Sequence, residues 1–156
     1  MKVSELTEKS LFIHNKNEKL MAQWATYKSS LIKATTSSRL KIFHEFSCGD
    51  GDSVNFTVFD HFMVEIRLAG EFYSKTIQYG LRLDTGDEAR FVELGRASFD
   101  DEGMLDGRVN NRDRDGVLEH YLEKIQSLYD TLYHAMQDTR PLNEVLLARW
   151  GATASV

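Results

Sequence analysis

The sequence has a single cysteine, Cys48, and a single proline, Pro141, among its 156 residues. One cysteine cannot form a disulfide within the chain, and one thiol does not make a metal cluster. No Pro/Gly/Ser-rich linker divides the chain, and its length is typical of one domain. No apolar stretch approaches the roughly 20 residues of a membrane span, and residues 1–10 are too polar for a secretory signal. We therefore expect one cytoplasmic domain over residues 1–156, with flexible ends at residues 1–15 and 151–156.

Motifs for nucleophilic, zinc and phosphate chemistry are also missing. The chain has no Gly-x-Ser-x-Gly and no His-Glu-x-x-His. Its Gly/Asp cluster at residues 49–52 carries two carboxylates, which repel phosphate, and no lysine follows. Acidic neighbours raise rather than lower the pKa of a cysteine thiol, which disfavours Cys48 as a nucleophile. These absences favour a protein that works by binding, without a cofactor, over an enzyme.

The strongest pattern present is the alternation of apolar and polar residues between residues 54 and 83. Successive side chains of a strand point to opposite faces, so this period of two predicts a sheet with one buried and one wet face. Such one-sided burial is typical of antiparallel sheets. Further strands are expected at residues 39–48 and 89–98, with turns at residues 49–52, 60–61, 69–71 and 84–87. The sequence thus predicts an α+β fold around an antiparallel meander of four or five strands.

Helical periodicity flanks this sheet. Apolar residues recur at spacings of three and four over residues 17–34 and again over residues 116–137. We expect a helix at each place, the longer one laying its stripe of Leu118 to Met136 across the apolar sheet face. Pro141 suits the first position of a short last helix ending at Trp150. Residues 4–14 fit either a short first helix or an ordered arm.

A loop before the second helix resembles the first two-thirds of an EF-hand calcium loop. Asn111, Asp113 and Asp115 alternate as oxygen ligands do, and Gly116 stands at the bend. Glu119 or Asp106 would complete the shell, but the twelfth position is Leu122 in place of a bidentate glutamate. The alternative is a polar loop in which Asp113 or Asp115 caps the helix. Calcium is the candidate ion if a cation binds here.

Two histidines and a tyrosine of the sheet region are candidates for a ligand or enzyme pocket between the sheet and the long helix, namely His44, His61 and Tyr79. His120 and His134 share a helix face with polar residues, and we interpret that face as solvated. No histidine pair has the spacing of a zinc site with a supporting third ligand.

Charge and aromatics suggest a surface for a macromolecular partner. Residues 84–119 hold eleven acids against five arginines, and three consecutive acids stand at Asp100, Asp101 and Glu102. Three phenylalanines fall out of phase with the apolar series of their strands and are candidates for an exposed binding patch, or else for core under a second helix layer: Phe59, Phe72 and Phe91.

We therefore predict a small acidic cytoplasmic protein that acts by binding another macromolecule, as an inhibitor, immunity protein, chaperone or adaptor does, with a protein as the favoured partner. A pI near 5.5 makes nucleic acid the less favoured partner. Pairing with a second copy through a sheet edge stays open. The competing hypotheses are an enzyme or ligand binder using the pocket and a divalent-cation protein using residues 111–119.

Overall fold

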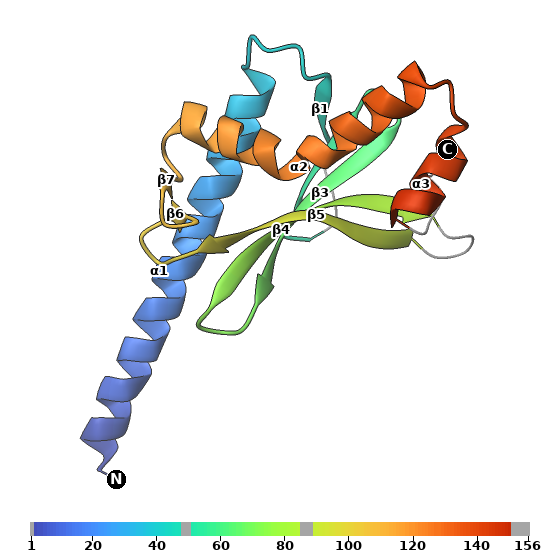
Figure 1. The fold of residues 1–156 in the computed structure, drawn as a ribbon. Helices are drawn as coiled ribbons and strands as arrows, with labels where there is room; N and C mark the ends of the chain where they lie inside the picture. The colour runs from blue at the N-terminus through green and yellow to red at the C-terminus, as the bar shows by residue number, and fades with distance from the viewer. Residues whose placement is uncertain (1, 48–50, 85–88, 151–156) are drawn as a thin grey trace.

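The computed structural model describes residues 2–47, 51–84 and 89–150, which form helices at the two ends of the chain and a sheet between them (Figure 1). The elements in order are α1 (Val3–Thr36), β1 (His44–Ser47), β2 (Val54–Val58), β3 (Phe62–Gly70), β4 (Lys75–Asp84), β5 (Ala89–Phe99), β6 (Met104–Leu105), β7 (Val109–Asn110), α2 (Arg114–Gln137) and α3 (Leu142–Trp150).

The sheet is an antiparallel meander in which every strand pairs with its neighbour in sequence. The predicted α+β class and antiparallel sheet are confirmed. The predicted strand number is wrong, because the sheet has seven strands. The two additional strands, β6 and β7, are two residues long and lie between the predicted last strand and the predicted second helix. Strands this short carry no detectable alternation.

The first strand is shorter than its alternation predicts. It begins at His44 instead of residue 39, because Phe43 has a positive φ of 55° and the backbone cannot extend through it. The predicted turn at residues 60–61 is present, since Phe59 and Asp60 both have φ of 55° between β2 and β3. The predicted turns at residues 49–52 and 84–87 fall largely outside the described residues, as does Cys48.

One face of the sheet forms the core together with both long helices. The buried face of β2 to β5 packs against Trp24 and Tyr27 of α1 and against Tyr121 and Ile125 of α2. The two helices also contact each other, and Figure 1 shows α2 crossing α1 near the carboxyl-terminal end of α1. A bulge at Tyr79/Gly80 shifts the β4–β5 register. Next to it, a Cβ on Gly95 would lie 2.7 Å from the Lys124 carbonyl oxygen, so glycine there lets α2 approach the sheet closely.

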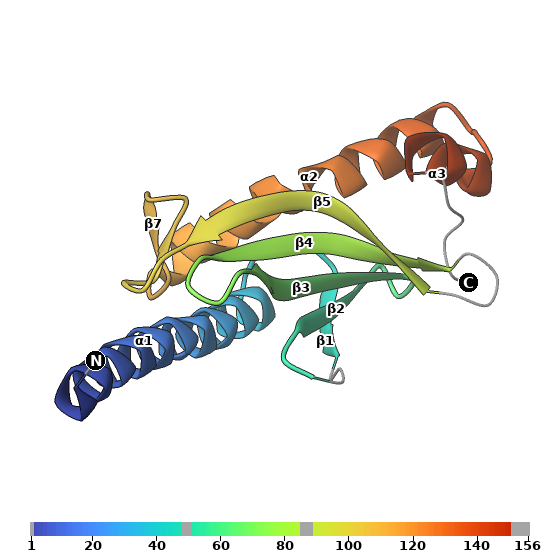
Figure 2. The same ribbon diagram turned by 90° about the horizontal axis from the view of Figure 1, so that it is seen from below.

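The amino-terminal helix is much longer than the predicted helix at residues 17–34. It is one continuous helix of 34 residues, and its first half extends away from the sheet and from α2 (Figures 1 and 2). The other two helices lie within two residues of their predicted bounds. Within the described residues, none of the helices is long and apolar enough to cross a membrane.

Candidate protein-binding groove

The projecting half of α1, residues 3–16, forms an arm whose side chains are all exposed. A 3–4 repeat of mainly apolar residues runs through the whole helix. In the body of the protein the repeat is buried, and it comprises Leu20, Trp24, Tyr27, Leu31 and Ala34.

In the arm the same repeat continues uncovered through Val3, Leu6, Ser10 and Ile13. The exposed fractions of its three apolar members are 79%, 55% and 51%. A stripe with this spacing is a helix-packing surface. The arm therefore presents one that no part of the described chain covers.

A groove of about 700 Å³ lies where the arm joins the body. It is formed by α1, by the loop between β3 and β4, and by the end of β5. Its wall is mostly apolar, and the lining residues are Phe12, Ile13, Lys16, Asn17, Leu20, Phe72, Tyr73, Ser74, Phe99, Asp100 and Asp101. Phe72 and Tyr73 are 58% and 80% exposed, so a large aromatic surface stands open beside the arm. Contiguous exposed apolar surface of this kind marks interaction sites.

Acidic residues form one rim of this groove. The Lys16 ammonium donates to Asp101 Oδ2 at 2.7 Å and links the arm to the loop after β5. That hydrogen bond raises the pKa of Lys16 and lowers the pKa of Asp101. Asp100 Oδ1 accepts the amides of Glu102 and Met104 and holds the acidic turn in shape. Glu102 is exposed beside them. The groove thus combines an apolar floor with a negative rim.

The structure brings together only part of the predicted partner-binding set. Phe72, Asp100 and Asp101 line the groove, with Glu102 in the same turn. Phe59 lies elsewhere, in a second apolar hollow. Phe91 is on the outer sheet face, where the Arg67 guanidinium sits 3.6 Å from its ring centroid.

The second hollow, of about 820 Å³, lies between α2, α3 and the β2–β3 turn. Its exposed apolar residues include Phe59, Tyr133 and Met136. Variants in this second hollow therefore serve as controls for variants in the groove.

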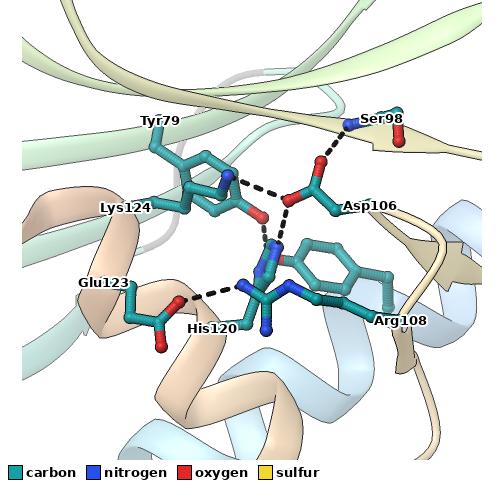
Figure 3. Close-up of polar contacts among 8 residues, drawn as sticks. Tyr79, Ser98, Asp106, Arg108, His120, Glu123 and Lys124 are labelled. Carbon is teal, nitrogen blue, oxygen red and sulfur yellow. Dashed lines mark hydrogen bonds and ion pairs between the residues drawn. The ribbon is translucent and has the colours of Figure 1, made fainter.

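Beneath α2, a partly buried polar cluster joins the β6–β7 hairpin to the core (Figure 3). His120 is 1% exposed, which corrects the interpretation of its helix face as solvated. Its Nε2 lies 2.8 Å from Asp106 Oδ2, the Lys124 ammonium lies 2.9 Å from the same oxygen, and the Ser98 amide donates to Asp106 Oδ1. Arg108 of the hairpin also pairs with Glu123 of α2.

The charges of this cluster follow from burial and hydrogen bonding. Burial raises the pKa of the Asp106 carboxyl, but the hydrogen bonds from Lys124, His120 and Ser98 outweigh it and lower the pKa to about 2. Burial lowers the pKa of His120, more than the neighbouring carboxylate raises it. A neutral imidazole that donates from Nε2 fits this environment, because Nδ1 is buried and has no partner among the described residues.

The three predicted pocket residues do not converge. The Tyr79 and Tyr27 hydroxyls are 2.7 Å apart in the filled core. His44 lies at the sheet edge with Nε2 2.7 Å from the Tyr121 hydroxyl. His61 is exposed and lines the second hollow. A pocket that uses all three residues is not present, and burial raises the pKa of both Tyr27 and Tyr79, so these phenols remain protonated.

The EF-hand-like loop is engaged in structural contacts. The Asn111 amide group donates to the Gln23 carbonyl oxygen at 2.9 Å and fastens the loop to α1. Asp113 is the N-cap of α2 and accepts from the Gly116 amide, as the capping alternative predicts. Asp115 and Glu119 point to solvent. Across the described residues, no group of three His, Cys, Asp or Glu side chains is placed to hold a metal ion.

The arm is the feature that sequence reasoning missed. The sequence of residues 4–14 fits either a short helix or an ordered arm, although the 3–4 repeat begins at Val3 and stays in register with Leu20 and Trp24. Two members of this repeat, Ser10 and Asn17, are polar. They interrupt the apolar pattern, so the repeat is not recognised when every position is required to be apolar.

Comparison with known proteins identifies relatives along almost the whole chain. The family model for HycA, described as the transcriptional repressor of the hyc and hyp operons, matches residues 1–147. The formate hydrogenlyase regulatory protein HycA of Escherichia coli K12 is 38% identical over 143 residues, which are 92% of this chain and 92% of that protein. The proteins of the same name from Escherichia coli O157:H7 and Shigella flexneri match to the same extent. No solved structure matches the chain.

Proposed function

The chain belongs to the HycA family of transcriptional repressors, and from that premise we propose that it regulates transcription by binding a protein partner in the groove beside its arm. The observation that carries this proposal is the continuous helix-packing stripe of α1, half of it buried in the body and half exposed. The expected setting is the cytoplasm, where transcription takes place in a bacterial cell. Family membership makes the target a macromolecule, and the apolar arm and groove favour a protein.

The charge distribution also favours a protein partner over DNA. The net charge is −5, and the rim of the groove is acidic. Neutralising phosphates needs clustered Lys and Arg residues, and DNA-reading proteins present a basic face. The helix that projects from the body exposes apolar residues along its length, in contrast to the polar surface of a recognition helix that reads base edges.

DNA contact is the second candidate, favoured by one basic surface. Lys33 of α1 and Arg112 and Arg114 before and at the start of α2 line a shallow hollow together with three hydroxyl side chains of α1. Among the described residues, none of these three cations is in an ion pair. Asp113 and Asp115 alternate with the two arginines and reduce the positive potential, so we rank this surface below the groove.

The test is repression in a living cell with surface variants. The chain is expressed in an Escherichia coli strain that lacks its own HycA and carries a reporter on the hyc operon. We expect the wild-type chain to lower reporter output, and Leu6→Glu and Tyr73→Glu to abolish that effect. Tyr133→Glu is the matched control, because it places the same charge on an exposed aromatic of the second hollow.

A mobility-shift experiment with hyc promoter DNA separates the two candidates. At physiological salt and with competitor DNA present, we expect the purified protein to give no retarded band. A specific band that disappears in Arg112→Ala with Arg114→Ala would overturn the protein-binding proposal. Loss of repression in Tyr133→Glu alone would move the contact from the groove to the second hollow.

A further inference from the structure

The flank of the exposed stripe carries charge of one sign. Lys2, Lys9 and Lys16 are spaced by seven residues, so they form a ridge along one side of the repeat. On the other side stand Thr7 and His14, which bring no negative charge. All five side chains are exposed.

The acids of the arm are placed away from this ridge and stripe. Glu5 and Glu8 lie about 120° and 180° around the helix from the centre of the stripe, at about 100° per residue. They face solvent when the stripe is covered. A partner that packs on the stripe between Val3 and His14 therefore meets Lys2 and Lys9 on one side and Thr7 and His14 on the other. Lys16 is already paired with Asp101 of the groove rim.

The arm extends from the packed half of α1, and most helical stability in proteins comes from the packing of an apolar face. Within the described residues, the arm meets the body through the Lys16–Asp101 pair and the groove-lining residues Phe12 and Ile13. Packing of the apolar stripe against a partner would stabilise the arm as a helix.

A second copy of this chain is a poor occupant for electrostatic reasons. Two arms packed parallel would place Lys9 beside His14 or Thr7 of the other copy, and two arms packed antiparallel would place lysine ridges together. Neither arrangement supplies an acid opposite a lysine, and the residues that flank the seam of a coiled coil set its choice of partner.

We infer that the partner segment is an amphipathic helix with acidic residues flanking its apolar seam, and that it packs along the arm as one strand of a short coiled coil. The inference rests on the proposed function, because it gives the chemistry of the partner for the same groove. About two heptads of partner helix cover the arm from Val3 to Asn17, at about 1.5 Å per residue. One end of that helix reaches the groove, where Phe72 and Tyr73 take an apolar anchor. Because the rim at Asp100 and Asp101 is itself acidic, the flanking acids of the partner lie opposite Lys2 and Lys9.

The experiment uses two synthetic 21-residue helical peptides with the same Leu/Ile seam. One peptide carries Glu and the other Lys at the positions that flank the seam, and each is labelled and titrated with the full-length protein by fluorescence anisotropy. We expect the acidic peptide to bind at least about tenfold more tightly, because several flanking charge pairs each contribute a small gain. The preference should shrink as salt is raised.

Variants test whether the lysine ridge causes the preference for the acidic peptide. Lys2→Glu with Lys9→Glu should reverse it, and Leu6→Glu should abolish binding of both peptides. Arg39→Glu with Lys41→Glu changes the net charge by the same amount in exposed residues after α1, and should leave the preference intact.

Three results would overturn the inference. These are equal binding of the two peptides, binding of neither, or a wild-type dimer in light scattering that Leu6→Glu converts to the monomer of 17.9 kDa. If any of them occurs while Leu6→Glu still abolishes repression and Tyr133→Glu does not, the groove keeps its proposed function and the acidic helix is excluded as its partner.

Discussion

Replacing Asp106 with asparagine tests the partly buried cluster that fixes the β6–β7 hairpin to α2. Asparagine keeps the shape of the side chain and tolerates the positive φ of 52° at this position. It removes the negative charge that faces Lys124 and His120. The substitution therefore isolates the contribution of the charge from that of the backbone.

The magnitude follows from the pKa of the carboxyl. Lowering it from 3.8 to about 2 corresponds to about 2–3 kcal/mol, at about 1.4 kcal/mol per pKa unit. The side chain is 26% exposed, so solvent screening reduces this figure, and we expect Asp106→Asn to cost about 1–2 kcal/mol of the free energy of unfolding. The folded-state pKa lies below the unfolded one, so this contribution is present above pH 3.8 and is lost as the pH falls towards 2.

Urea unfolding at pH 7, followed by tryptophan fluorescence, measures the loss directly. Asp130→Asn is the control, because it removes an exposed acid from α2 and should change stability by less than about 0.5 kcal/mol. The difference between wild type and Asp106→Asn should narrow below about pH 4. Equal stability of Asp106→Asn and wild type at pH 7, or an equal loss in Asp130→Asn, would refute this description of the cluster.

Three further predictions concern the core. Burial lowers the pKa of both His44 and His120 below 6.5, so the unfolded chain binds more protons and the melting temperature should fall as the pH drops from 7 to 5.5; an unchanged melting temperature would contradict neutral, buried imidazoles. Gly103→Ala should cost about 1–3 kcal/mol in urea unfolding, since φ is 81° and a Cβ would lie 2.5 Å from a side-chain oxygen of α1; a smaller loss would show that the loop can move. Tyr27→Phe should cost about 1–2 kcal/mol by leaving the Tyr79 hydroxyl unpaired, and adding Tyr79→Phe should recover part of the loss; additive losses in a double-mutant cycle would exclude the hydroxyl pair.

Strong local periodicity made much of the fold predictable from sequence. Alternation over residues 54–83 corresponds to β2, β3 and β4, and the 3.6-residue period of residues 116–137 corresponds to α2 within two residues. The two-residue strands β6 and β7 are held by pairing with β5 and with each other, which leaves no local pattern. Their absence from the prediction explains why the strand number was wrong.

The environment of His120 was unpredictable for the same reason. Its helix face is polar in sequence, but the β6–β7 hairpin folds over it and brings Asp106 to the ring. The burial of His120 depends on its contact with Asp106, which is 14 residues away in the sequence. The angular position of His120 around α2 does not predict that contact. The groove was partly predictable, because Phe72, Asp100 and Asp101 were selected by phase and charge, whereas their proximity to the arm depends on the tertiary fold.

The most direct test of the central proposal is photo-crosslinking inside repressing cells. A photoreactive amino acid is placed at Ile13, in the groove, and separately at Tyr133, in the second hollow. Binding of a protein in the groove predicts one defined protein adduct from position 13 and none from position 133, and the adduct should disappear with Leu6→Glu. Repression that persists while position 13 yields only a DNA adduct, or no adduct, would contradict it.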